Sequence, residues 1–326
     1  MSVDETFYQR VIETCFPNIR VAHIRFKGGG TCRVFVVNHS LIFRFPHAGG
    51  SVDNGDAPEE DGAFLFHEKR VYDSVAPLLR LPVPRYRYFS AGCEQFPYPV
   101  AGYARLSGRS LSGCSISEDE LQRVAGQIGA FLSELHAIPL STLPAELRPP
   151  SPSTIGRDNA RSLFRQVKAQ AFPLLSAEEQ EWTSNLFREM SGDSSLWELT
   201  PVFTHGDFDG SNILYDESRG EVSGVIDFEE AGQKGDPAVD FCALLAGFGT
   251  AFLEAVLNSY TLDVSRAMRR RIELIARRIL FIELLYGIQV NDRRFIDNAR
   301  QRLHRARHDI DPIGDWLDVS TSATRE

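Results

Sequence analysis

The stretch "HGDFDGSNIL", residues 205–214, decides how the rest of this 326-residue sequence is interpreted. It places Asp207 and Asn212 five positions apart, and a turn that leads into a short strand can bring both side chains to the same cleft. Asp227 lies 15 residues beyond Asn212 and follows the apolar run "SGVI". Each residue alone is well explained as a turn cap or a strand end. Their joint occurrence, with a His-Gly-Asp start and an Asp-Phe after an apolar run, favours a functional site.

The five-residue spacing is that of the kinase catalytic loop, HxDxxxxN. In such a loop the Asp accepts the proton of an attacking hydroxyl, and the Asn amide oxygen ligates magnesium. A carboxylate at the end of a nearby strand suits a second magnesium ligand that bridges the β- and γ-phosphates of a nucleotide. The pattern therefore predicts Asp207 as catalytic base and Asn212 and Asp227 as Mg²⁺ ligands.

The composition is that of a globular protein, with 43% hydrophobic and 24% charged residues. The net charge of −9 argues against a nucleic-acid partner and suits a cationic or metal-chelated ligand, although solubility alone also explains it. The Arg-rich segment 266–307 carries an apolar helical stripe, which indicates a solvated helix face rather than a nucleic-acid surface.

Cysteine usage and the N-terminal segment bear on the compartment. The five cysteines are odd in number, scattered and without a CxxC pair, so neither a disulfide framework nor a structural zinc site is supported. The first 17 residues lack the basic and apolar regions of a signal peptide. No uncharged apolar run reaches the ~18 residues needed to cross a bilayer. We expect a cytoplasmic monomer with no membrane partner.

The distribution of apolar residues predicts an α+β first part, residues 1–106, and a mostly helical second part, residues 107–326. The first part contains expected helices at 4–16 and 63–79 and expected strands at 20–27, 32–38, 41–46, 84–90 and 98–106. Residues 106–113 have the composition of a hinge, and the acidic segment 47–62 that of a surface insertion rather than a lid.

The second part is expected to contain helices at 118–137, at about 156–190, and from 236 onward. Residues 139–154 are Pro- and Ser-rich and indicate a linker. The strand-like pieces are "PVFTHGD", "SNILYD" and "VSGVIDF". One buried face of the C-terminal helices is predicted from a helical stripe: Met268, Ile272, Ile275, Ile279, Ile282 and Tyr286.

Three stretches, "THGDFDGSNIL" (204–214), "VIDFEEAG" (225–232) and "GDPAVDF" (235–241), resemble the aminoglycoside phosphotransferase family, nearest the 2''-aminoglycoside phosphotransferases. That family shares the protein-kinase fold but has HGD in place of HRD, and IDF or IDW in place of DFG. The segment between Asn212 and Asp227 is too short to contain an activation loop, which argues against a protein kinase. In the family, the aspartates that match Asp236 and Asp240 are structural.

The resemblance covers roughly residues 20–310 and implies a bilobal, protein-kinase-like α+β fold. The N-terminal lobe would be small and built on an antiparallel sheet, and the C-terminal lobe larger and mostly helical. The same resemblance implies Asp207 as the base and Asn212 and Asp227 as magnesium ligands. Softer matches are "AFLSELHAI" (130–138), which is structural in the family, and "FIELLYGI" (281–288), which lies where the 2'' subgroup contacts its aminoglycoside.

The resemblance also implies a nucleotide site in the first part. "FKGGGTCRVFVV" is similar to the phosphate-positioning loop, with Gly28, Gly29, Gly30 and Thr31, although three glycines between strands also make an ordinary tight turn. Arg44 stands where most kinases have a lysine, and keeps the positive charge. Its expected carboxylate partner is Glu68, for which a solvated helix face is the alternative. Further predicted nucleotide contacts are backbone groups near Ala104 and Leu106.

The expected reaction is transfer of the γ-phosphoryl group of ATP or GTP to a hydroxyl of a cationic aminoglycoside. A polycationic acceptor needs carboxylates beside the base. The candidates for acceptor binding are Asp209, Glu229, Glu230, Glu283 and Tyr286. The same enzyme class with another acceptor (a macrolide, a nucleoside antibiotic, homoserine, choline or a sugar) remains an alternative. A third possibility is a catalytically inactive nucleotide-binding scaffold, which the intact Asp207, Asn212 and Asp227 argue against.

Overall fold

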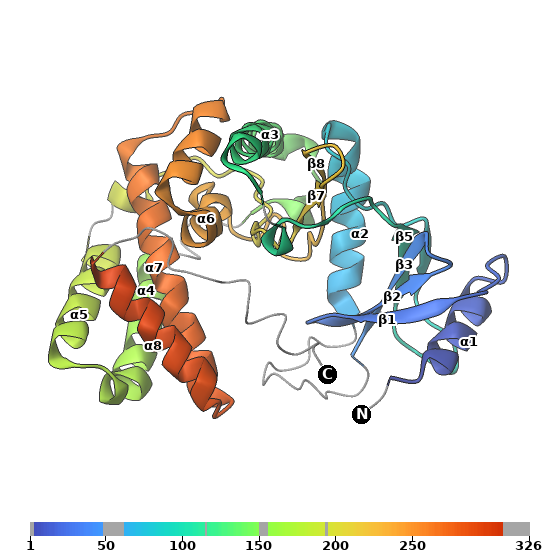
Figure 1. The fold of residues 1–326 in the computed structure, drawn as a ribbon, viewed down its shortest axis with the longest axis horizontal. Helices are drawn as coiled ribbons and strands as arrows, with labels where there is room; N and C mark the ends of the chain where they lie inside the picture. Colours follow the sequence, from blue (N-terminus) through green and yellow to red (C-terminus); the bar gives the residue numbers. More distant parts are fainter. Residues whose placement is uncertain (1–2, 48–61, 115, 150–155, 193–194, 309–326) are drawn as a thin grey trace. The chain divides into compact units, whose positions relative to one another are not determined.

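The computed structural model describes residues 3–308 except 48–61, 115, 150–155 and 193–194 (Figure 1). The chain forms two compact units. Unit 1 contains residues 1–107 and 224–229, and unit 2 contains residues 108–223 and 230–326. The sequence predicted one boundary near residue 106 and did not anticipate that 224–229 returns to unit 1. This return has a local cause, because the amide of Val225 donates to the carbonyl of Pro82 at 3.0 Å. The acidic segment 47–62 lies almost wholly outside the described residues.

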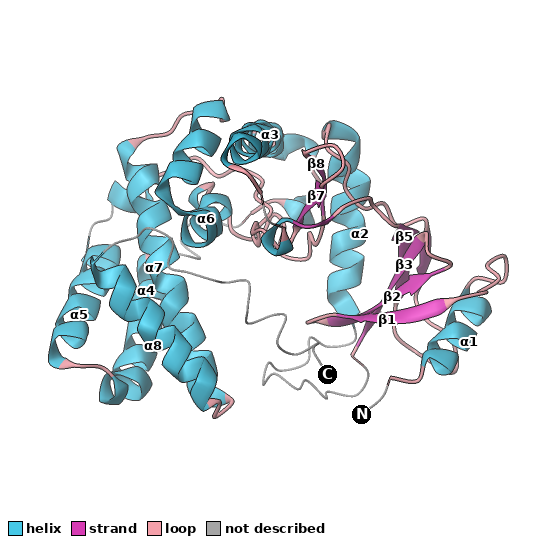
Figure 2. Cartoon of the chain, in the orientation of Figure 1, coloured by secondary structure: helices cyan, strands magenta, loops and turns pink. Residues whose placement is uncertain are grey.

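Unit 1 is built on an antiparallel sheet (Figure 2), in the order β1-β2-β3-β5-β4. Its strands are β1 Ile24–Gly28, β2 Cys32–Val37, β3 Leu41–Pro46, β4 Tyr88–Ser90 and β5 Val100–Ala104. Asn38 and His39 join β2 to β3 with φ angles of 49° and 61°. Two successive left-handed residues form the tight hairpin turn that matches strand twist. The predicted antiparallel sheet is confirmed, and most of its strands are shorter than expected.

The two faces of this sheet have different partners. Phe35 pairs with Phe43 across β2 and β3, and both are fully buried against α1 (Glu5–Cys15). Val34 pairs with Arg44 on the opposite face, since neighbours along a strand point to opposite sides. The helix α2 (Ala63–Val75) buries Glu68, whose carboxylate reaches Arg44.

Unit 2 is mostly helical (Figures 1 and 2). Its helices are α3 Glu118–His136, α4 Arg157–Gln166, α5 Ala177–Gly192, α6 Ala238–Ser259, α7 Arg266–Gln289 and α8 Arg293–His308. The helical stretch predicted at about 156–190 is confirmed, but it is not one continuous α-helix. A π-helical turn at 167–171 and a 3₁₀ turn at 172–174 separate α4 from α5. Pro173 lies in that 3₁₀ turn and cannot supply the N–H that a continuing α-helix needs.

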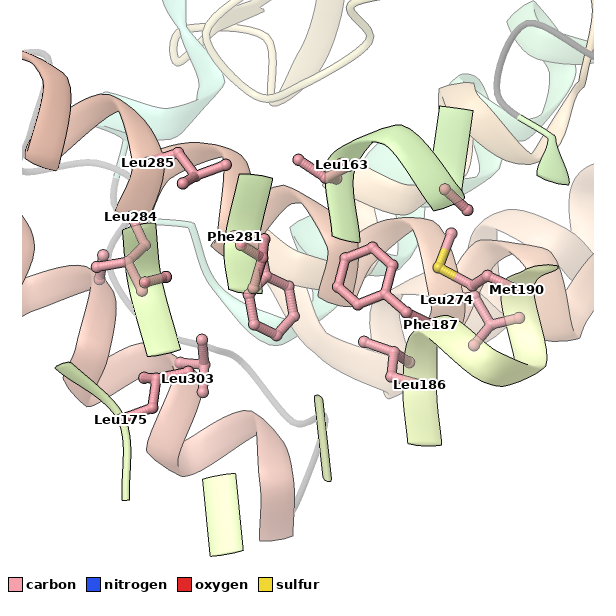
Figure 3. Close-up of a cluster of buried hydrophobic side chains, with 14 of the residues drawn as sticks. Leu163, Leu175, Leu186, Phe187, Met190, Leu274, Phe281, Leu284, Leu285 and Leu303 are labelled. Atoms are coloured by element: carbon pink, nitrogen blue, oxygen red, sulfur yellow. The ribbon is translucent and has the colours of Figure 1, made fainter. Parts of the chain in front are cut away.

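One hydrophobic core of unit 2 lies where α4, α5, α7 and α8 pack together. Figure 3 shows Phe187 and Phe281 at its centre, and their ring centroids are 5.3 Å apart. The predicted stripe on α7 is correct for its first half, where Met268, Ile272 and Ile275 are buried. Ile282 is 41% exposed, so the second half of the prediction is wrong. α7 packs against both α6 and α8, and helical periodicity alone does not show which side of a helix each neighbour covers.

α6 is the helix among the described residues whose length and composition would allow it to cross a membrane. Of its apolar window, 61% is buried inside the protein. α6 packs against α3 and α7, and a buried core helix has the same composition as a membrane span.

A small sheet, in the order β6-β7-β8, lies mainly in unit 2. Its strands are β6 Arg109–Ser110, β7 Ile213–Asp216 and β8 Glu221–Val225. "SNILYD" and "VSGVIDF" therefore contain strands as predicted, whereas "PVFTHGD" does not. The latter segment instead bonds irregularly to residues 232–235, through the amide of Val202 to Gly235 and the amide of Gly232 to Thr204, both at 2.9 Å.

Candidate active site

The buried carboxylate of Asp240 fixes the backbone of the His-Gly-Asp turn, residues 205–207, in unit 2. The amides of His205 and Gly206 donate to the two oxygens of Asp240 at 2.7 and 2.8 Å. Gly206 has a φ of 90°, and a Cβ at this position would lie 2.5 Å from the carbonyl oxygen of Glu230. Only glycine fits both the backbone angle and this close approach. The backbone conformation of the turn is therefore fixed, and it places Asp207 at an exposed position.

Asn212 orients Asp207 from the other side. Its amide nitrogen donates to the backbone carbonyl of Asp207 at 2.9 Å and to the Oδ2 atom of the same residue at 3.2 Å. This leaves the amide oxygen of Asn212 as the group that could ligate a cation. The structure thus brings Asp207 and Asn212 together as the sequence predicted.

Asp236 and Asp240, predicted to be structural, both lie in buried networks. Asp240 also accepts from His136 at 3.0 Å. Burial alone would raise the pKa of Asp240, but the hydrogen bond and charge of His136 bring that pKa below its ordinary value. Asp236 pairs with Arg271 at 2.8 Å and accepts from the amide of Ala238 at 3.0 Å. Burial raises the pKa of Asp236, and Arg271 offsets part of that rise.

Lys234 is a residue that sequence reasoning missed. Its ammonium donates to the carbonyl of Gly206 at 2.8 Å and pairs with Glu230 at 3.3 Å. Its position between two recognised motifs, "VIDFEEAG" and "GDPAVDF", was the available signal. Nothing in the linear pattern shows that the side chain reaches back to the His-Gly-Asp turn.

Unit 1 contains a buried charge cluster centred on Arg44. Arg44 is 5% exposed, and its guanidinium donates to both oxygens of Glu68, at 2.7 and 2.6 Å. Glu68 is fully buried and also accepts from the hydroxyls of Tyr72 and Tyr86. The predicted Arg44–Glu68 pair is confirmed, and the alternative of a solvated helix face for Glu68 is wrong.

Asp227 and Glu229 bind the same guanidinium. Arg44 contacts Asp227 at 3.0 Å and Glu229 at 3.2 Å. Asp227 has a φ of 68°, a left-handed conformation that costs a non-glycine residue about 1–3 kcal/mol and is found at functional sites. Its side chain is 35% exposed, which leaves it accessible to a cation.

Glu229, predicted to bind the acceptor, lies instead among residues predicted to bind the nucleotide. Besides Arg44, its carboxylate accepts from the hydroxyl of Thr31 at 2.9 Å. Burial and the charge of Asp227 raise the pKa of Glu229 to about 7.

The glycine-rich loop joins β1 to β2. Gly28 and Gly29 have φ angles of 110° and 140°, and a Cβ on Gly29 would lie 1.9 Å from the carbonyl oxygen of Cys32. Glycine is therefore obligatory at position 29, while Gly30 and Thr31 are exposed. This geometry is compatible with the predicted phosphate-binding loop, because small exposed residues let backbone amides approach a ligand.

Ala104 ends β5 opposite Leu41, and Leu106 follows it, where backbone contacts to a purine were predicted. A pocket of about 400 Å³ lies beside this segment. Its lining residues are His23, Arg25, Phe26, Lys27, Val36, His39 and Arg105. Val36 pairs with Ile42, two residues before Arg44, so the pocket and Arg44 share one face of the sheet. Partial burial and the charge of Arg105 lower the pKa of Lys27.

The other predicted acceptor-binding residues are dispersed in unit 2, and several are already engaged. Asp209 accepts from the amide and hydroxyl of Ser211. Glu283 pairs with Arg302 at 2.6 Å, so its charge is neutralised within the protein. Tyr286 packs edge-to-face on Phe295, with ring centroids 5.4 Å apart. Glu230 is the partner of Lys234.

Within the described part of the chain, no three His, Cys, Asp or Glu residues gather as a metal site. Magnesium is usually held by one or two protein ligands together with substrate phosphates and water. Asn212 in unit 2 and Asp227 in unit 1 each carry an oxygen donor of the kind that magnesium binds.

Comparison with known proteins gives three findings. A profile of the phosphotransferase enzyme family matches residues 24–274. Viomycin phosphotransferase from Streptomyces vinaceus is 31% identical over 181 residues, which cover 55% of this chain and 60% of that protein. The match therefore spans less than two thirds of the length of this curated relative.

Solved structures share the fold. The GDP and kanamycin complex of APH(2")-IIia superposes with a TM-score of 0.78 at 24% identity, covering 92% of this chain and 97% of that one. A macrolide 2'-phosphotransferase type I superposes with a TM-score of 0.68 at 21% identity, covering 93% and 99%. The predicted kinase-like fold, with an antiparallel-sheet part and a mostly helical part, is confirmed. The chain belongs to the phosphotransferase enzyme family, the family that its His-Gly-Asp and Ile-Asp-Phe motifs predicted.

Proposed function

We propose that this protein is a small-molecule kinase that transfers the γ-phosphoryl group of ATP or GTP to a hydroxyl of an aminoglycoside antibiotic and thereby confers resistance. The observation that carries the proposal is the Asp207 turn. Its backbone is held by Asp240, its carboxylate is oriented by Asn212, and its side chain is exposed. Family membership supplies the reaction class.

In the proposed reaction, Asp207 accepts the proton of the acceptor hydroxyl while the hydroxyl oxygen forms a bond to the γ-phosphorus. The bond between the γ-phosphorus and the bridging oxygen breaks, and the nucleoside diphosphate leaves with the electron pair. Asn212 and Asp227 would hold magnesium, which neutralises charge on the β- and γ-phosphates. Arg44 would bind the phosphates as a fixed cation, because Glu68 keeps its guanidinium in place.

The acceptor is the less constrained half of the proposal. Two of the acidic residues expected to bind a polycationic acceptor, Glu229 and Glu283, already pair with arginines. The similarity to viomycin phosphotransferase favours a second candidate. In it, the same transfer is made to the hydroxyl of another antibiotic, such as viomycin.

The test is a transfer assay with Mg-ATP and Mg-GTP against kanamycin, gentamicin, viomycin, a macrolide and simple alcohols. Phosphorylated products gain about 80 Da by mass spectrometry, the mass of the transferred phosphoryl group. Product with kanamycin or gentamicin supports the leading proposal, and product with viomycin alone supports the second candidate. No product with any acceptor, from a folded protein that binds nucleotide, would overturn both.

The matched control is Asp207→Asn, which keeps the size of the side chain and removes its basicity. We expect it to lose product formation and to keep nucleotide binding, because Asp207 is assigned to the acceptor proton and not to the phosphates. Wild-type turnover by this variant would refute the assignment of the base.

A further inference from the structure

Lys234 makes a contact that the reaction as described does not use. Its ammonium donates to the carbonyl of Gly206 at 2.8 Å, one residue before the proposed base. The contact lies entirely within unit 2.

The carbonyl of Gly206 and the amide of Asp207 belong to one planar peptide group. Lys234 holds the oxygen end of this group, and the ring of His205 accepts from its N–H end at 3.3 Å. A planar unit that is fixed at both ends also fixes the direction in which the next Cα carries its side chain. The orientation of Asp207 is therefore coupled to Lys234.

The other partners of the turn do not duplicate this contact. Asp240 binds the two amides on the inner side of the turn, and Asn212 binds the carbonyl and the carboxylate of Asp207 itself. Within the described part of the chain, Lys234 is the side chain that contacts the carbonyl of Gly206. A hydrogen bond with a charged donor is roughly twice as strong as a neutral one.

The ion pair of Lys234 with Glu230 does not by itself explain the position of the lysine. The two side chains are 30% and 41% exposed and 3.3 Å apart. Exposed pairs of this kind are screened by water and contribute little to stability. The pair does aim the ammonium, because Glu230 lies four residues before Lys234 on the same segment, and the peptide carbonyl of Glu230 packs directly on Gly206.

We propose that Lys234 is a positioning residue for the catalytic turn, which holds the Gly206–Asp207 peptide so that the Asp207 carboxylate meets the acceptor hydroxyl. This inference rests on the proposed function. Removing the ammonium leaves the turn folded, because Asp240 and Asn212 remain, but lets the 206–207 peptide rotate. Small errors in the placement of a catalytic group reduce turnover strongly.

The experiment compares Lys234→Met, Lys234→Arg and the wild type, with Lys168→Met as control. Lys168 also belongs to unit 2, and its ammonium lies over the ring of Phe164 at 5.3 Å. For Lys234→Met we expect kcat to fall about 10- to 100-fold, as for loss of one charge-assisted hydrogen bond. The KM for nucleotide and the Tm should stay close to wild type. Lys234→Arg should recover most of kcat, and Lys168→Met should leave it unchanged.

Three results would overturn the inference. The first is a wild-type kcat in Lys234→Met, with the proposed function intact. The second is a fall in Tm and nucleotide affinity that parallels kcat, which would mean a general structural role. The third is a failure of Lys234→Arg to recover activity while its Tm is normal. A wild-type protein that transfers no phosphoryl group to any acceptor and hydrolyses no nucleotide would refute the proposed function itself, and the inference with it.

Discussion

Breaking the ion pair between Arg44 and Glu68 should destabilise unit 1. Arg44→Met leaves a fully buried carboxylate without its guanidinium. Removing one partner of a buried pair costs about 3–5 kcal/mol. The lower end applies here, because Glu68 still accepts from Tyr72, Tyr86 and the amide of Phe228. We expect a loss of about 3 kcal/mol.

This loss can be converted into a change in melting temperature. The entropy of unfolding is about 2.1 cal/mol/K per residue. Unit 1 has roughly 110 residues, so a loss of about 3 kcal/mol lowers its Tm by roughly 13 °C if it unfolds separately. If the whole chain of 326 residues unfolds together, the same loss lowers the Tm by roughly 4 °C. Calorimetry distinguishes the two cases by the number of transitions.

Comparison of the single and double variants tests whether the unpaired charge of Glu68 causes the loss of stability. Replacing both Arg44 and Glu68 by Met removes the unpaired charge, so the double variant should be more stable than Arg44→Met by at least about 1.5 kcal/mol in urea unfolding. Arg109→Met is the control, because its pair with Glu217 is more than half exposed on both sides and should contribute less than about 1 kcal/mol. Equal stability of Arg44→Met and the double variant would refute the reasoning.

Three further predictions concern stability and pH. Phe281→Ala should cost about 3–5 kcal/mol in denaturant unfolding, because its fully buried ring packs on Phe187, and a loss below 1 kcal/mol would contradict the packing. The pKa of Glu229 is raised to about 7 from an ordinary 4.5, so the folded protein should lose stability as the pH rises from 4.5 to 7 and Glu229 ionises. Glu229→Gln should reduce this dependence of the Tm on pH. The pKa of Asp240 is lowered in the folded state, so the ionised carboxylate stabilises the fold fully above about pH 3.8, and this stabilisation is lost as the pH falls further. The stability of Asp240→Asn should therefore lack this dependence on pH in acid unfolding.

Local patterns predicted much of the fold and the central motif. The hairpin of β2 and β3 follows from two short runs rich in Val, Ile and Phe and from the turn at Asn38 and His39 between them, and both signals act over a few positions. The approach of Asn212 to Asp207 needs only the short turn between them. The pairing of Arg44 with Glu68 was also predicted, although only through resemblance to a family and not through spacing.

Other features were not visible in the sequence because they depend on distant partners. The break between α4 and α5 and the exposure of Ile282 depend on how the helices of unit 2 pack, and helical periodicity does not contain that information. Glu283 was predicted to bind the acceptor, but Arg302 of the neighbouring helix α8 neutralises its charge. This pairing also depends on a distant partner that the sequence does not show.

The sequence by itself thus determined the family and the residues that carry the proposed chemistry, because that chemistry requires particular side chains at short, fixed spacings. The tertiary structure alone decided which charges are already paired, where segment 224–229 returns to unit 1, and that Lys234 reaches the carbonyl of Gly206. These are contacts between segments that the chain brings together only when it folds, and hydrogen bonds and ion pairs act over a few ångströms of space regardless of separation along the sequence.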